Sequence, residues 1–152
     1  MKLTENLSLA EVTKSATAIR MSIANTPSAT HLIALKEVSK NIFQPCREHF
    51  GKPLAVTSGY RSEALNEAIN GSKTSQHSKG EALDLDADVF GGFSNAELFN
   101  YIKDHLDFDQ LIWEFGNNNN PAWVHCSYKT RGNRNEVLIA IKTNGKTTYR
   151  KL

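Results

Sequence analysis

Three residues of this chain carry side chains that can bind a metal ion, in a spacing that suggests one shared site. His77 and Asp84 lie seven residues apart, where a polar loop leads into an expected strand, and His125 follows far downstream after Trp123 and Val124. Two imidazoles and one carboxylate can bind zinc and leave a fourth coordination position free for water. A buried carboxylate without a partner is costly, and a divalent cation would supply that partner. The pattern therefore predicts a metal centre with one open position.

The spacing alone leaves a second interpretation open. A single histidine is more often a surface or core residue than a ligand, and an aspartate on a strand often simply faces water. Three other histidines fit that description: His31 and His49 lie at the two ends of one expected helix, and His105 lies near the end of another. The dipole of a helix favours a cation at its carboxyl end. We expect these three histidines to be structural or solvated.

The chain resembles the M15 family of zinc peptidases in two motifs. One is Ser-x-His-x-x-Gly-x-Ala-x-Asp at residues 75–84, and the other is Trp-x-His at residues 123–125. Ser-Gly-Tyr-Arg at residues 58–61 and the acidic segment 111–115 are similar to two further parts of the family, in the same order. The family includes D-alanyl-D-alanine carboxypeptidases and phage endolysin endopeptidases, which cut the stem peptides of peptidoglycan.

The resemblance implies one peptidase domain over residues 1–152 and one zinc ion (Zn2+) held by His77, Asp84 and His125. It also implies an α+β fold of the hedgehog/DD-peptidase-like type, with a mainly antiparallel sheet and flanking helices. The implied activity is hydrolysis of peptidoglycan stem peptides, by a D-Ala-D-Ala carboxypeptidase or an L-Ala-D-Glu-type endopeptidase resembling a phage endolysin. The implied partner is the stem peptide, and we expect the protein to act as a monomer.

Peptide hydrolysis on zinc also needs a general base that takes a proton from water and delivers it to the leaving amine. Many family members carry an acid three residues before the last histidine, but this chain has Ala122 there. Glu114, on the adjoining expected strand, resembles the Trp-Glu pair of phage-type relatives and is the candidate base. The competing interpretation is a surface carboxylate on an edge strand.

Arg61 and Ser75 are the remaining candidates for the site. Arg61 follows a strand and a glycine, so its guanidinium could reach a cleft, where it would stabilise an oxyanion or bind a substrate carboxylate. An exposed ion pair with Glu63 or Glu67 is the alternative. We expect Ser75 to orient the neighbouring His77 or to bind substrate.

Local patterns predict an α+β order of elements. A capping box at Ser8 predicts a first helix with an apolar stripe that reaches Ile23, and a second helix from near Ala29 that Pro45 kinks or shortens. Further helices are expected from Ser62 and from Ser94. Strands are expected at 54–58, 82–89, 109–115, 122–128, 136–142 and 147–150, with a hairpin turn at residues 144–145. In strand 82–89, Asp86 and Asp88 would share the face of Asp84, but neither is expected to bind metal.

The composition is that of one globular domain. A chain of 152 residues can bury one core, and no apolar run approaches the roughly 20 residues of a membrane span. The amino-terminal segment lacks the layout of a signal peptide, so we expect synthesis in the cytoplasm and action on the cell wall after release. The two cysteines, Cys46 and Cys126, are predicted to be core residues rather than a disulfide or zinc ligands.

Positive charge gathers at the carboxyl end. Residues 129–152 contain seven Lys or Arg and one acid, Glu136, whereas the whole chain has a net charge of only +2. Such a segment could bind an anionic partner or could simply be a solvated hairpin.

Two alternative functions are considered. One is a non-catalytic zinc-binding domain of the same fold, and the other is a nucleic-acid-binding module that uses the basic segment. Glu114 and Arg61 argue against the first, and the shortage of aromatic residues in the basic segment argues against the second.

Overall fold

The computed structural model describes all residues 1–152 and has an α+β fold built on a mixed six-stranded sheet. The strands lie in the order β3-β4-β6-β5-β7-β8, and every neighbouring pair is antiparallel except β5 and β7, which are parallel. Their bounds are β3 (Ala55–Ser58), β4 (Ala82–Asp86), β5 (Gln110–Glu114), β6 (Trp123–Ser127), β7 (Glu136–Thr143) and β8 (Lys146–Lys151). The predicted α+β class is confirmed, and the sheet is antiparallel in all but one of its strand pairs.

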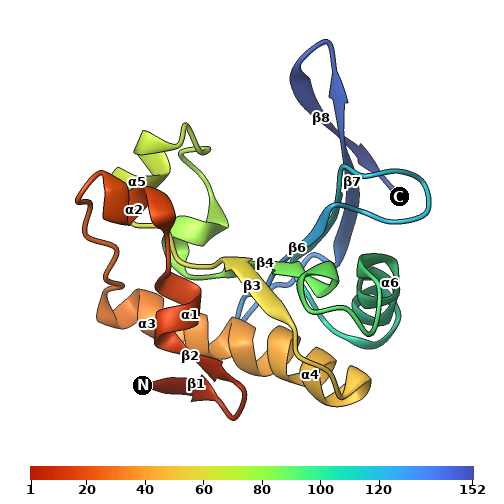
Figure 1. Cartoon of the computed structure of the whole chain (residues 1–152), viewed down its shortest axis with the longest axis horizontal. Helices are drawn as coiled ribbons and strands as arrows, with labels where there is room; N and C mark the ends of the chain where they lie inside the picture. Colours follow the sequence, from red (N-terminus) through yellow and green to blue (C-terminus); the bar gives the residue numbers. More distant parts are fainter.

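The remaining elements surround this sheet. They are β1 (Lys2–Thr4), β2 (Leu7–Ser8), α1 (Leu9–Thr13), α2 (Ala16–Arg20), α3 (Ala29–Val38), the π-helical turn η1 (Ser39–Phe43), α4 (Gln44–Phe50), α5 (Glu63–Ala68), the 3₁₀ turns η2 (Gln76–Lys79) and η3 (Ala87–Val89), and α6 (Asn95–His105). In Figure 1, α3 and α4 run below the sheet, and α5 and the β7–β8 hairpin rise above it on opposite sides. No helix is both long and apolar enough to cross a membrane.

The core lies between the lower face of the sheet and the helices α3, α4 and α6. Because side chains alternate along a strand, every second residue of β4, β5 and β6 points into this core. The buried strand residues are Leu83, Leu85, Leu111, Val124 and Cys126. Cys46 and Cys126 are both free thiols and fully buried in the same core, as the sequence predicted.

The expected first helix is in fact two short ones, α1 and α2. The capping box at Ser8 forms as predicted, but the chain becomes extended at Lys14. Ser15 then caps α2 by accepting a hydrogen bond from the backbone N–H of Ala18, and Ile19 is left 77% exposed. The periodic apolar stripe predicted a helix that is too long, because the second cap at Ser15 divides it.

Pro45 does not shorten the helix that begins at Ala29. The helical path continues through the π-helical turn η1 and ends at Phe50. Proline lacks an N–H and cannot donate to the preceding turn. The wider turn η1 precedes it, so Pro45 falls within the first turn of α4, where that donor is not needed. The buried stripe through Ile42 and Cys46 is therefore retained.

One strand is shorter than predicted. β4 ends at Asp86 rather than near Val89, because the Asp86 side chain caps the turn η3 by accepting from the backbone N–H of Asp88. The last strands do not pair in simple chain order, since β7 crosses to the free side of β5 and pairs with it in parallel. The polar loop 72–80 contains the short turn η2.

Candidate active site

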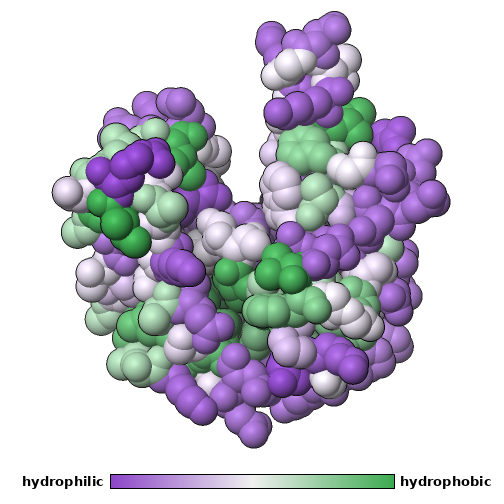
Figure 2. All heavy atoms as spheres, in the orientation of Figure 1, coloured by the Kyte–Doolittle hydropathy of each residue, from purple (hydrophilic) through white to green (hydrophobic).

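A cleft of about 1020 Å³ opens on the sheet face opposite the core. One wall comes from the segment that follows α5, residues 69–79 including η2, and the other comes from the β7–β8 hairpin. The space-filling view shows the same hollow between two raised parts of the surface (Figure 2). All six residues proposed from the sequence for the site line this cleft: Arg61, Ser75, His77, Asp84, Glu114 and His125.

Strand register brings Asp84 and His125 together on the floor of the cleft. Asp84 of β4 is paired with His125 of β6, which is in turn paired with Ile112 of β5. Directly paired residues point to the same face of a sheet, so all three face away from the core. Glu114, two residues beyond Ile112, is on this face as well and pairs with Trp123.

The third proposed ligand, His77, is presented by the turn η2. Ser75 caps this turn, and its hydroxyl accepts a hydrogen bond from the His77 backbone N–H at 3.3 Å. Gly80 ends the turn in the left-handed region, at φ +73°. A Cβ at Gly80 would lie 2.5 Å from the carbonyl oxygen of His31, so only glycine fits there. Close packing of η2 against α3 thus explains the glycine of the motif.

The orientation of the His77 ring is set by a backbone carbonyl. Its Nδ1 lies 2.7 Å from the carbonyl oxygen of Gly59. A carbonyl can only accept, so Nδ1 must carry the proton and Nε2 keeps its lone pair. Nε2 lies 3.4 Å from Oδ1 of Asp84, on the cleft side. His77 is therefore held in the tautomer that can coordinate a metal through Nε2.

The donor atoms of His77, Asp84 and His125 fit a metal ion. They all lie within 4.8 Å of one another, and Nδ1 of His125 is 3.0 Å from Oδ1 of Asp84. Burial lowers the pKa of His77, which favours the neutral ring. Burial by itself would raise the pKa of Asp84, but the two histidines outweigh it and hold that pKa well below its usual range. A neutral imidazole and an ionised carboxylate are the protonation states that metal binding requires.

Glu114 lies in a more apolar part of the same floor. The residue is 7% exposed, and it pairs with Ala140 of β7, which forms a small buried cluster with Ile112 and Leu138. Burial raises the pKa of Glu114 to about 7, with the charge of His125 opposing this shift and that of Asp84 adding to it. Its carbonyl oxygen accepts from the backbone N–H of Ala122 at 2.9 Å. Glu114 is therefore a cleft residue and not a surface carboxylate on an edge strand.

Arg61 reaches the cleft without forming the ion pair that was the alternative interpretation. Its Nη1 donates to Oδ1 of Asn66 at 3.2 Å, and its Nε is buried with no partner. Burial lowers the pKa of this guanidinium, and Asp84 opposes the shift. The backbone N–H of Arg61 donates to the carbonyl of His77, which ties the two segments together. Nη2 makes no hydrogen bond, so this part of the guanidinium stays available to a ligand in the cleft.

The acids at the end of β4 serve another purpose. The carboxylates of Asp86 and Asp88 both accept from the side-chain amide of Asn95, at 2.9 and 3.2 Å. Asn95 is completely buried, and its amide oxygen accepts from the backbone N–H of Ala87 at 2.7 Å. The two acids therefore close a turn and are not part of the group formed by His77, Asp84 and His125.

The other histidines lie outside the cleft. His49 stacks on Tyr101 at a centroid distance of 4.0 Å, and His31 meets the Tyr60 hydroxyl at 3.2 Å. Sequence patterns did not single out Gln76 or Asp109, although Asp109 is fully buried and bonded to the turn that carries His77. No periodicity marks a single buried acid whose partners come from distant segments.

The chain belongs to the peptidase M15 family, whose model matches residues 5–127. No curated protein matches the chain at a significant level. The matched range includes all six cleft residues named above and ends at the last residue of β6. Membership in this family makes the protein a peptidase and its substrate a peptide.

Proposed function

We propose that the protein is a zinc-dependent peptidase that hydrolyses the stem peptides of peptidoglycan, in the manner of a phage endolysin. The observation that carries the proposal is the convergence of donor atoms from His77, Asp84 and His125 on the floor of a peptide-sized cleft, in a member of the peptidase M15 family. Zinc, when bound, would polarise a peptide carbonyl and lower the pKa of water to about 7. The likeness to hedgehog and DD-peptidase folds is part of the same proposal.

Glu114 is the proposed general base. Its pKa of about 7 lets it gain and lose a proton near neutral pH, which is what transfer from water to a leaving amine requires. It lies beside Ala122, the position at which many family members carry their acid, because the two residues are joined by a backbone hydrogen bond. A carboxylate from β5 would thus replace one from the loop before β6.

Arg61 is proposed to stabilise the negative charge that develops on the carbonyl oxygen, or to bind a substrate carboxylate. Its buried Nε has no partner, and its guanidinium faces the same cleft as His77 and Asp84. A preorganised donor in a site shielded from water contributes more than the same donor in solution. Ser75 is proposed to act on His77 through its capping hydrogen bond, with a direct contact to substrate as the alternative.

The substrate is proposed to be a peptide of several residues. Small-molecule sites usually occupy about 300–1,000 Å³, and this cleft reaches the top of that range at about 1020 Å³. Both a carboxypeptidase and an internal endopeptidase of stem peptides fit such a volume. Mass analysis of the fragments released from purified sacculi would identify the bond that is cut.

Metal analysis tests the proposal together with hydrolysis of sacculi. We expect one tightly bound zinc per chain in the wild-type protein. His77→Ala and His125→Ala should each lose both the zinc and the hydrolysis of sacculi. His105→Ala is the matched control, because this exposed histidine at the end of α6 lies outside the cleft. Zinc should also raise the melting temperature, since a ligand that binds only the native state stabilises it.

The non-catalytic alternative gives a different result. A non-catalytic zinc domain would retain zinc in the wild-type protein but release nothing from sacculi. Full zinc content in either histidine variant would remove that residue from the metal site.

A further inference from the structure

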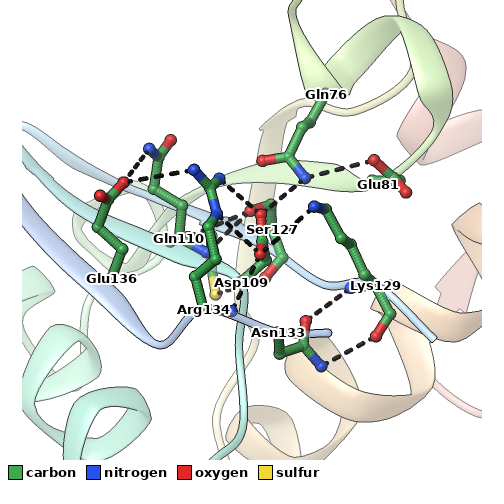
Figure 3. A network of polar contacts seen from close by, with 10 residues as sticks. Gln76, Glu81, Asp109, Gln110, Ser127, Lys129, Asn133, Arg134 and Glu136 are labelled. Carbon is green, nitrogen blue, oxygen red and sulfur yellow. Dashed lines mark hydrogen bonds and ion pairs between the residues drawn. The ribbon is translucent and has the colours of Figure 1, made fainter. Parts of the chain in front are cut away.

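Asp109 is a fully buried acid immediately before β5, and its partners Gln76, Lys129 and Arg134 line the cleft. The Arg134 side chain donates to both of its oxygens, with Nε 3.0 Å from Oδ1 and Nη2 2.7 Å from Oδ2. The backbone N–H of Arg134 adds a third hydrogen bond at 3.1 Å, and Nζ of Lys129 lies 3.8 Å away. Figure 3 shows these donors surrounding the Asp109 carboxylate. None of these residues is used by the proposed chemistry.

A fourth hydrogen bond, from the Gln76 side chain, connects Asp109 to the turn that carries a proposed metal ligand. Nε2 of Gln76 lies 3.1 Å from Oδ2 of Asp109 and 3.3 Å from Oε1 of Glu81 (Figure 3). Gln76 is the first residue of η2 and the chain neighbour of His77. The side-chain amide of Gln76 therefore links two segments. One is the turn that carries His77, and the other is the residue immediately before β5, Asp109.

Asp109 is also fastened to the strand that carries the other histidine. Its backbone N–H donates at 2.8 Å to the carbonyl oxygen of Ser127, two residues beyond His125 on β6. One buried residue thus bonds to the segments on both sides of the cleft floor that supply the two imidazoles. These two segments are far apart in the sequence.

We propose that Asp109 and Gln76 are positioning residues, which hold the η2 turn so that Nε2 of His77 faces Asp84 and His125. The proposal rests on the proposed zinc site. Gln76 acts through its neighbour His77 and contacts neither the metal nor the substrate.

The pairing with Arg134 makes Asp109 a rigid anchor for this contact. A planar guanidinium that donates to both carboxylate oxygens fixes the orientation of the carboxylate, which a single hydrogen bond would not do. These bonds outweigh the effect of burial and lower the pKa of Asp109, so the acceptor stays ionised. Gln76 therefore binds a charged oxygen whose direction is set by another segment.

Gln76→Met is the informative variant, because methionine has a similar length and shape but no amide donor. Asp109 keeps its bonds to Arg134, so the variant should fold with an unchanged melting temperature in the metal-free form. Its zinc dissociation constant, measured by competition with a chelator, should rise about 10- to 100-fold, as is typical when a residue that orients a ligand is lost. Amide hydrogen exchange at residues 77–80 should become faster in the same metal-free protein.

Two control variants isolate the contact to Asp109. Gln110→Met removes an amide of the same network, which donates to Glu136 at 2.8 Å and does not touch η2. Glu81→Ala removes the other partner of the Gln76 amide. Both should keep zinc affinity within about threefold of the wild-type value. A Gln76→Met protein with wild-type zinc affinity and wild-type exchange at 77–80 would refute the proposal, and so would equal losses in Gln76→Met and Glu81→Ala.

The result also separates this inference from the proposed function. If the wild-type protein bound no zinc, the proposed function would fail, and the exchange measurement would still decide whether Asp109 and Gln76 order the turn. If the wild-type protein bound zinc and cut sacculi while Gln76→Met matched Gln110→Met, the positioning role alone would be wrong.

Discussion

Two carboxylates on the cleft floor, Asp84 and Glu114, face the same space but differ in protonation because their neighbours differ. Asp84 lies between two histidines, which keep its pKa well below the usual range. Glu114 lies beside Ile112, Leu138 and Ala140, and burial there raises its pKa to about 7. Environments that push two pKa values apart are typical of a site in which one acid stays ionised while another exchanges protons. These residues therefore suit the two proposed roles of ligand and general base.

Replacement of Glu114 by glutamine should abolish proton transfer without removing zinc. The amide is nearly isosteric and the residue is not a proposed ligand, so the fold and the zinc content should be retained. Turnover on stem peptides should fall roughly 10²- to 10⁴-fold, the usual range for loss of a positioned acid–base group. The low-pH limb of the rate profile should change too, because the group that must ionise is gone. Near-wild-type turnover in the zinc-loaded variant would assign the base to another residue.

Glu114 should also make the stability of the metal-free protein depend on pH. Its pKa is raised from 4.5 to about 7 on folding, so the folded state binds more protons than the unfolded state between these values. Stability should therefore fall as pH rises from about 4.5 to 7 and stay lower above pH 7. At 1.36 kcal/mol per pKa unit, the loss is at most about 3 kcal/mol.

Denaturant unfolding of the metal-free protein tests this dependence. Glu114→Gln should be more stable than the wild-type protein at pH 8, by up to about 3 kcal/mol, and the difference should vanish near pH 4. Glu67→Gln is the control, because Glu67 is exposed on α5. An equal gain at both pH values would mean that the effect does not come from ionisation of Glu114.

At the scale of the element, the short turn η2 matters most, because it presents His77 and has few bonds of its own. It is held by the Ser75 cap, by the Gln76 contact to Asp109 and by the close approach of Gly80 to α3. A four-residue 3₁₀ turn has little intrinsic stability, so packing has to supply it. The position of His77 is therefore a property of these contacts.

Gly80→Ala should disrupt this turn more than a comparable substitution elsewhere. Alanine in the left-handed region costs about 1–2 kcal/mol at any site. At Gly80 the new Cβ would also meet the carbonyl oxygen of His31 at 2.5 Å, whereas at Gly132, with φ +74°, nothing lies within 4 Å. Gly132→Ala should therefore show only the conformational cost, and Gly80→Ala should lose more stability and bind zinc more weakly. Equal unfolding free energies for the two variants would show that η2 moves freely away from α3.

On the scale of the whole molecule, the structure divides the basic carboxyl-terminal segment into two parts. Arg134 and Lys129 face Asp109 at the base of the cleft, so their charge is partly neutralised. Lys146, Arg150 and Lys151 lie on β8, which is exposed along its whole length at the edge of the sheet. The available positive charge therefore lies on the hairpin that forms one wall of the cleft (Figure 1).

This hairpin should strengthen attachment to anionic wall surfaces. Binding to sacculi should weaken as salt rises, since exposed charges are screened beyond about 10 Å at 0.1 M salt. Neutralisation of Lys146, Arg150 and Lys151 to glutamine should weaken binding at low salt and flatten the salt dependence. Binding that is independent of salt would leave β8 as an ordinary solvated strand.

The matched control neutralises three lysines away from the hairpin, Lys36 and Lys40 near the end of α3 and Lys103 on α6, all of them exposed. It changes the net charge by the same amount. Equal weakening in both triple variants would mean that net charge, and not the hairpin, governs attachment.

Much of the fold could be predicted because its signals are local. The capping boxes at Ser8 and Ser94 and the hairpin turn at residues 144–145 each depend on neighbouring residues, and all three form. The division of the first helix and the parallel pairing of β5 with β7 could not be predicted in this way. Neither the second cap at Ser15 nor the long-range pairing of β5 with β7 changes the apolar periodicity of the sequence, so periodicity does not reveal them.

For the site, the sequence by itself indicated which side chains are present and on which kind of segment each lies: His77 in a polar loop, and Asp84 and His125 on two strands. Only the tertiary structure decided that Asp84 pairs with His125, because register is set by packing across segments about 40 residues apart. It also decided the burial that raises the pKa of Glu114, and the placing of Asp109 against Gln76. Burial and electrostatic environment are sums over distant neighbours, and no local pattern encodes them.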